Sequence, residues 1–217
     1  MSRQPVDPNW FTRLPRVRMQ EHLKWLSQLR TSIENIASFG CWGSSESLAL
    51  MWTLNATEVK GIEKKKEHFS EAEEELECLR KEIPAAFEGR SVEFILADMS
   101  TEVAELPSNY FDLAYCEKVL DSMYMESDCQ KVRDAIREMA RVVKPGGWVI
   151  AVEPKIGVEF KEVTDDYESK LFGCKITKPV RMSSPKDISS LFKDAGLVRD
   201  NRVKGTPNGA YCYRKKP

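Results

Sequence analysis

The 217-residue sequence lacks the features that mark membrane, secreted and strongly charged proteins. No apolar run approaches the roughly 20 residues that a membrane-spanning helix needs. The first residues carry no apolar core of the kind found in signal peptides. The formal net charge is −1, so the overall charge gives no reason to expect a nucleic acid or an anionic membrane as partner. We therefore expect a cytoplasmic protein.

The sequence also lacks paired cysteines and internal repeats. Its six cysteines are scattered, without a CxxC pair, which argues against a zinc site or a disulfide-stapled scaffold. We expect no metal site and a reducing cytoplasmic setting. The cysteines are Cys41, Cys78, Cys116, Cys129, Cys174 and Cys212.

The most informative stretch that is present runs over residues 33–50. An apolar segment reaches Gly40, a turn of small residues follows, and a helical pattern begins at Ser45. The N–H groups at the start of a helix have no partners within the helix and can hold a polar or negative group. Gly40 and Gly43 allow positive φ and let a ligand approach the backbone. The pattern predicts a ligand-binding turn between a strand and a helix.

Further strands and helices alternate along the chain, which predicts a parallel sheet with right-handed crossovers. The amphipathic helix 128–143 is expected to end at a turn formed by Lys144, Pro145, Gly146 and Gly147. The other predicted helices cover residues 17–30, 64–82 and 185–195. The later strands cover 57–62, 91–97, 110–116, 148–152, 197–203 and 210–213.

The length fits one domain, 1–217, with two attached segments. Residues 1–31 are locally basic and predict an N-terminal helical cap, which is either a packed helix or a lid that attracts an anionic substrate. Residues 155–183 have little periodicity and are long for a connection, so we expect an insert near the active site.

An acidic residue follows the second strand at Glu63, about twenty positions beyond the glycine turn. A carboxylate there is suited to accept hydrogen bonds from both hydroxyls of a ribose. The third strand leads in the same way to Asp98 and Met99.

Five segments together resemble the class I S-adenosylmethionine-dependent methyltransferases, in particular their small-molecule branch. The likeness covers roughly residues 33–213, and the helix that runs into KPGG and a strand is its most telling part. It implies a Rossmann-like three-layer α/β sandwich whose mostly parallel seven-stranded sheet has an antiparallel last strand. The segments are FGCWG (39–43), GIE (61–63), ADM (97–99), FDLAYCEKVLD (111–121) and REMARVVKPGGWVIAVEP (137–154).

The resemblance also implies a cofactor, S-adenosylmethionine, and a role for each matching residue. Glu63 would bind the ribose hydroxyls, Asp98 the adenine amino group, and Met99 the adenine ring. Cys116 and Glu117 would line the floor beneath the sulfonium. The turn that would hold the methionine portion consists of Phe39, Gly40, Cys41, Trp42 and Gly43.

The implied reaction is in-line methyl transfer to a small-molecule acceptor, by a monomer or a homodimer. A general base is needed only for an oxygen acceptor or a protonated nitrogen. Glu117, Asp121 and Tyr115 are the catalytic candidates, and Tyr124, Glu153 and His22 are further possible bases.

Two other functions stay open. Ser38 stands where the family usually has an acid, and Trp42 and Ser44 stand where it usually has glycines. A relative that binds the cofactor, transfers no methyl group and acts through a protein partner is therefore the alternative. A nicotinamide-dependent oxidoreductase is disfavoured, because the turn is not a full GxGxxG.

Overall fold

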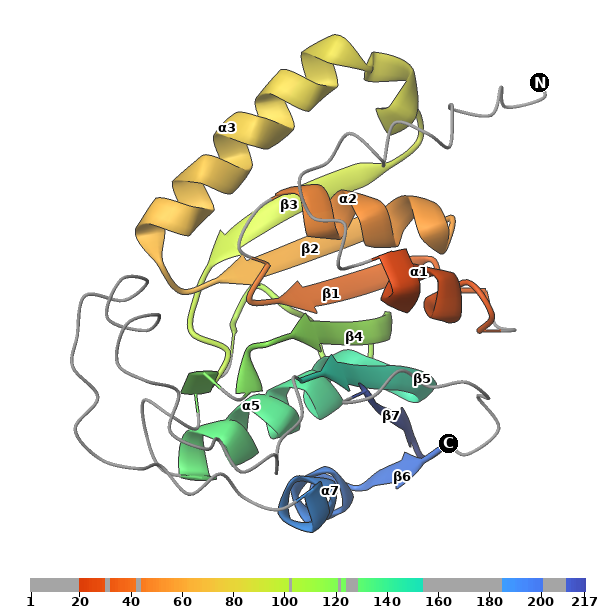
Figure 1. Cartoon of the computed structure of the whole chain (residues 1–217), viewed down its shortest axis with the longest axis vertical. Coiled ribbons are helices and arrows are strands. Elements are labelled where there is room, and N and C mark those ends of the chain that lie inside the picture. The colour runs from red at the N-terminus through yellow and green to blue at the C-terminus, as the bar shows by residue number, and fades with distance from the viewer. Residues whose placement is uncertain are drawn as a thin grey trace, which may run out of the picture.

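The protein is a layered α/β structure built on one seven-stranded sheet (Figure 1). The strands lie in the order β3-β2-β1-β4-β5-β7-β6. Their bounds are β1 Asn35–Phe39, β2 Glu58–Glu63, β3 Ser91–Leu96, β4 Phe111–Glu117, β5 Val143–Val152, β6 Leu197–Arg199 and β7 Ala210–Lys215. The computed structural model describes residues 20–29, 32–41, 44–101, 103–120, 122–123, 129–153, 185–200 and 210–217.

The pairing confirms the predicted fold class. Strands β3, β2, β1, β4 and β5 are parallel neighbours, whereas β7 lies antiparallel to both β5 and β6. The last strand along the chain is thus inserted between the fifth and the sixth. Helices make the connections from β1 to β2, from β2 to β3 and from β4 to β5, as is usual for crossovers between parallel neighbours.

Helices cover both faces of the sheet and bury a separate apolar core on each. One core contains Trp25, Leu48 and Leu76 from α1, α2 and α3. The other contains Ile136 of α5 and Phe192 of α7. The helices are α1 Gln20–Leu26, α2 Ser44–Thr53, α3 Lys66–Glu82, α5 Cys129–Val142 and α7 Pro185–Asp194, with the short 3-10 helix η3 at Pro84–Phe87.

The strand order reverses between β1 and β4. From β1 the chain proceeds through β2 and β3 toward one edge, and from β4 through β5 toward the other. In open α/β sheets, ligands bind at the carboxyl ends of the strands beside such a reversal. The fold therefore predicts a ligand-binding site among the residues at the carboxyl ends of β1, β2, β3 and β4.

One boundary differs from the sequence expectation. Helix α5 ends at Val142, and the KPGG segment lies within β5, which begins at Val143 instead of Trp148. The register with β4 advances from Phe111–Val143 directly to Leu113–Trp148, so KPGG forms a bulge. The turn-forming residues are present as expected, but pairing of Val143 with β4 extends the strand around them.

The two attached segments are largely outside the described residues. Of the predicted cap, the structure describes residues 20–29, where Trp25 and Leu26 of α1 are buried in the core that α2 shares. The insert 155–183 and the hairpin turn at 201–209 lie outside the described part, as does the extension predicted for β6 beyond residue 200. No helix in the described residues is long and apolar enough to cross a membrane.

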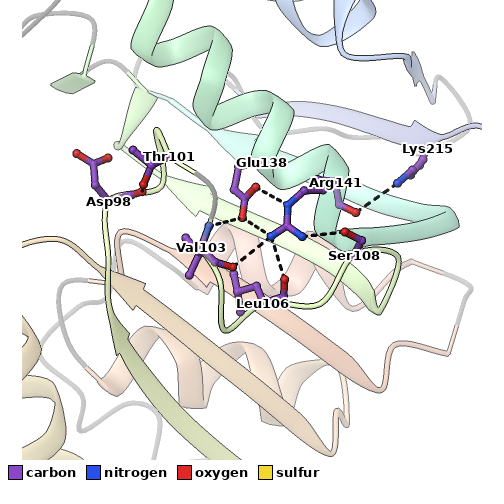
Figure 2. A network of polar contacts seen from close by, with 8 residues as sticks. All are labelled: Asp98, Thr101, Val103, Leu106, Ser108, Glu138, Arg141 and Lys215. Atoms are coloured by element: carbon purple, nitrogen blue, oxygen red, sulfur yellow. Dashed lines mark hydrogen bonds and ion pairs between the residues drawn. The ribbon is translucent and has the colours of Figure 1, made fainter.

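A partly buried ion pair, in which the Glu138 side chain is 5% and the Arg141 side chain 24% exposed, joins the segment after Asp98 to α5 (Figure 2). Arg141 pairs with Glu138 at 2.6 Å, and the Arg141 guanidinium also donates to the carbonyl oxygens of Val103 and Leu106. Glu138 in turn accepts the Val103 N–H at 3.0 Å. The pair thus satisfies backbone groups of an irregular segment that would otherwise be buried without partners.

The same C-terminal end of α5 is also held by Lys215 of β7. Its ammonium donates to the carbonyl oxygens of Ala140 at 2.8 Å and Val143 at 2.9 Å, and to the side chain of Asn109. Carbonyls in the last turn of a helix have no partners within the helix, and a cation there is also favoured by the helix dipole. The last strand and α5 are therefore joined directly.

We expect Arg141→Ala to destabilise the protein by about 3 kcal/mol, because it leaves Glu138 as a buried charge without its cation. Arg137→Ala is the matched control on the same helix. Its pair with Asp134, at 3.3 Å, joins side chains that are 56% and 36% exposed, and the loss should be below about 1 kcal/mol. Urea unfolding measures both. Equal losses would contradict a special role of the partly buried pair.

Candidate active site

The glycine turn at the end of β1 is shaped by close contacts. Gly40 has φ of +68°, and a Cβ on this residue would lie 2.4 Å from Val119 Cγ2. Its N–H donates to the carbonyl oxygen of Ile62 in β2 at 2.7 Å. Phe39 and Cys41, on either side, are fully buried. A side chain at position 40 would meet both strain and a clash, so glycine is required there.

The turn continues through Trp42 and Gly43, which lie outside the described residues. The structure therefore does not test their predicted role. Helix α2 begins one residue earlier than expected, at Ser44.

Glu63 ends β2 with its side chain buried and its carboxylate oriented by the backbone. Oε1 accepts the Lys65 N–H at 2.9 Å and lies 3.8 Å from His68 Nδ1. Within the described part of the chain, Oε2 has no hydrogen-bond partner. One oxygen is therefore fixed while the other remains able to accept a bond from a ligand.

Asp98 repeats this arrangement after β3. Its Oδ1 accepts both the backbone N–H of Ser100, at 2.8 Å, and the Ser100 hydroxyl, at 2.7 Å. The described residues provide no hydrogen-bond partner for Oδ2. Burial raises the pKa of Asp98, but the two bonds from Ser100 and the charges of Lys64 and Lys131 outweigh it, so the pKa is lowered. The side chain is an ionised hydrogen-bond acceptor at neutral pH.

Glu63 and Asp98 stand at the carboxyl ends of the neighbouring strands β2 and β3. Glu63 pairs with Leu96 in the parallel β2–β3 register, and the Ala97 N–H donates to the Glu63 carbonyl oxygen at 3.0 Å. Asp98 is the next residue, and Met99 beyond it is buried. The structure thus places the two acidic residues at the ends of neighbouring parallel strands.

The end of β4 carries a small polar cluster. The Tyr115 hydroxyl donates to Glu117 Oε2 at 3.1 Å, and His22 Nδ1 of α1 lies 3.6 Å from the same oxygen. Burial raises the pKa of Glu117, but contact with His22, the Tyr115 hydroxyl and Lys118 outweighs it and the pKa is lowered. Tyr115 is fully buried, and burial followed by the charges of Glu46 and Glu117 raises its pKa well above 10.0. At neutral pH Tyr115 is therefore a donor, and Glu117 is ionised.

Cys116, near the end of β4, lies next to this cluster in the sequence, and Glu153, directly after β5, lies next to it in the sheet. Both side chains are buried. Glu153 Oε1 accepts the Leu120 N–H at 3.0 Å and the Cys116 thiol at 3.9 Å. Glu153 thus holds the segment that follows β4 in place. The sequence around Glu153, an acid before a proline, gave no sign of this structural role. The candidates Asp121 and Tyr124 lie outside the described residues.

The residues present fit a bound adenosyl cofactor. The free oxygens of Glu63 and Asp98 offer acceptors to hydroxyl and amino groups. Ser38, which replaces the acid usual at its position, is 0% exposed and its hydroxyl has no hydrogen-bond partner in the described residues. A buried hydroxyl without a partner is costly and suits a ligand or a bound water.

Comparison with known families identifies the class. A family model described as "Methyltransferase domain" matches residues 38–151, more than half of the chain. The chain therefore belongs to this family of S-adenosylmethionine-dependent methyltransferases, as the resemblance implied. It is a methyl-transferring enzyme, and its cofactor is S-adenosylmethionine. No curated protein matches the chain by sequence.

Solved structures share the fold at low sequence identity. A SAM-dependent methyltransferase from Aquifex aeolicus is 15% identical with a TM-score of 0.61, and the match covers 96% of this chain and 97% of that one. N-methyltransferase NodS from Bradyrhizobium japonicum, in complex with S-adenosyl-L-homocysteine, is 17% identical with a TM-score of 0.59, covering 97% and 90%. The [4+2]-cyclase SpnF is 19% identical with a TM-score of 0.57, covering 84% of this chain but 57% of that one.

The lowered pKa of Glu117 predicts a pH dependence of stability. The folded state favours the ionised carboxylate, so this contribution is present above the ordinary value of 4.5 and is lost as the pH falls through the lower folded pKa. We expect Glu117→Gln to flatten the fall in unfolding free energy between about pH 6 and about pH 3. Tyr115→Phe, which removes one donor, should flatten it partly. Parallel curves for the wild type and Glu117→Gln would refute this.

Proposed function

We propose that the protein transfers the methyl group of S-adenosylmethionine to a small-molecule acceptor. The observation that carries the proposal is the pair of strand-end carboxylates, Glu63 and Asp98. Each has one oxygen fixed by the N–H group two residues later, and neither has a partner among the described residues for the other oxygen. They follow β2 and β3, on the β1 side of the strand-order reversal.

In this proposal each residue contributes a contact that its position supports. Glu63 accepts hydrogen bonds from the ribose hydroxyls, and Asp98 accepts one from the adenine amino group. Met99 packs against the adenine ring. The turn formed by Phe39, Gly40, Cys41, Trp42 and Gly43 holds the amino-acid portion, and Cys116 lies beneath the sulfonium.

Glu117 and Tyr115 are proposed to act at the same portion of the cofactor. Because Glu117 is ionised, it can attract the cationic end of the ligand, and the Tyr115 hydroxyl fixes the direction of its carboxylate. The raised pKa of Tyr115 and the lowered pKa of Glu117 make both poor proton acceptors near neutral pH. Asp121 remains the proposed base if the acceptor is an oxygen or a protonated nitrogen.

A bound S-adenosylmethionine supplies an activated methyl group, so the chain chiefly needs to align an acceptor with it. Orientation of reactants contributes up to about 7–11 kcal/mol in well-aligned systems. A small acceptor is proposed because a helix that runs into KPGG and a strand is typical of the family's small-molecule branch. Residues 1–31 and 155–183 are the segments proposed to enclose the acceptor. We propose that the protein is a monomer or a homodimer and that it acts in the cytoplasm.

Glu63→Ala and Asp98→Ala should each weaken binding of S-adenosylhomocysteine by about 10- to 100-fold, since a hydrogen bond to a charged group contributes about 1.5–3 kcal/mol. Isothermal titration calorimetry measures the affinity. Glu67→Ala, which alters an exposed acid near Glu63 on α3, is the matched control and should bind as the wild type does. Unchanged affinity in both strand-end variants would refute the proposed site.

Turnover separates the enzyme from a relative that binds without transfer. The wild type is incubated with S-adenosylmethionine and a panel of small acceptors bearing hydroxyl, amine or thiol groups, and S-adenosylhomocysteine is quantified. We expect formation above the no-acceptor control with at least one class. Binding without any turnover would favour the alternative, for which Ser38 at the family's acidic position is the motivating observation.

A further inference from the structure

The start of α2 is occupied by a carboxylate from another helix. Glu75 of α3 accepts the Ser44 N–H at 3.0 Å and the Ser44 hydroxyl at 2.6 Å through Oε2, and the Ser45 hydroxyl at 2.8 Å through Oε1. Ser44 is fully buried, and Glu75 is half-buried. Both oxygens of one carboxylate are thus bonded to the first residues of α2.

This contact distinguishes Glu75 from the other acids of α3. Its neighbours in the sequence form a solvent-exposed acidic surface, whereas Glu75 points toward α2 and makes three hydrogen bonds there. The exposed acids are Glu71, Glu73, Glu74 and Glu77.

The occupied position is the one where a strand–turn–helix unit ordinarily binds an anion. N–H groups in the first turn of a helix have no partners within the helix, and the helix dipole adds partial positive charge. Dinucleotide-binding sheets place a pyrophosphate at this point, after the first strand. Here a carboxylate of the chain itself accepts one of these N–H groups, that of Ser44, together with the hydroxyls of Ser44 and Ser45. Glu46 adds a second acidic side chain in the first turn of α2.

We propose that Glu75 is a specificity-determining residue of the adenosyl site. Its carboxylate fills the anion position at the start of α2, so the site admits adenosine ligands without phosphates and disfavours those that carry them. The proposal rests on the proposed function, since it assumes that the cofactor lies at the turn between β1 and α2. S-adenosylmethionine carries no phosphate, and the α-carboxylate of its amino-acid portion is accompanied by an α-ammonium group. That portion is therefore neutral overall, and a carboxylate at the start of α2 repels it less than it repels a phosphate.

The same contact positions the turn itself. Its first residues are held by β2, because the N–H groups of Gly40 and Cys41 both donate to the carbonyl oxygen of Ile62. Its end is held by Glu75 at Ser44. Since β2 also carries Glu63 and continues into α3, one strand and its following helix fix both the turn and the ribose acid.

The test compares two ligands in three proteins. Wild type, Glu75→Gln and the control Glu74→Gln are titrated calorimetrically with S-adenosylhomocysteine and with adenosine diphosphate. We expect Glu75→Gln to shift the ratio of the two affinities toward adenosine diphosphate by about tenfold or more, because a like charge beside a phosphate is removed. Loss of fold cannot produce a gain of adenosine diphosphate binding.

The outcomes are separable. A ratio in Glu75→Gln equal to that of the wild type overturns the inference, and so does an equal shift in Glu74→Gln, which would indicate a general charge effect. Thermal denaturation checks that the variants are folded, and Glu75→Met replaces Glu75→Gln if that variant is not. If the wild type binds no S-adenosylhomocysteine, the proposed function fails. The gain or absence of adenosine diphosphate binding in Glu75→Gln still decides the inference.

Discussion

Parallel pairing of β1, β2 and β3 is the constraint on which the candidate site depends. Because these strands run in one direction, their carboxyl ends lie on the same side of the sheet. Gly40 and Asp98 follow β1 and β3, and Glu63 is the last residue of β2 between them. The backbone bonds from Gly40 to Ile62 and from Ala97 to Glu63 carry the pairing beyond the strands into the site itself. A shift of register would separate the two carboxylates from the turn even if every side chain were kept.

The sequence was sufficient to predict this framework because each part leaves a local signal. Apolar alternation marks the strands, and an acid at the end of a strand stands out against buried neighbours, as at Glu63 and Asp98. The bulge at KPGG could not be predicted in the same way. Gly146 and Gly147 indicate a turn, but whether the strand resumes around it depends on pairing with Phe111 of β4, which is distant in sequence.

The role of Glu75 in the candidate site could not be predicted from the sequence for the same reason, because it depends on a contact between two segments that are distant in sequence. It is one of many acids in a charged helix. Helical spacing places Glu75, three residues after Ala72 and four before Leu79, beside the buried face of α3, but that spacing does not say which group it meets there. The contact with Ser44 depends on the packing of α3 against α2, which joins segments that are distant in sequence. Carboxylate orientation by N–H groups two residues later, at Lys65 and Ser100, is likewise a property of the folded turns.

The insertion of β7 between β5 and β6 sets an order in which the sheet can be completed during synthesis. β7 leaves the ribosome after the six other strands, so one side of β5 has no neighbouring strand until that point. Lys215 secures the last turn of α5 only then. Between the emergence of β5 and that of β7, the nascent chain therefore presents an unpaired edge of β5, the kind of surface to which chaperones bind and at which chains aggregate.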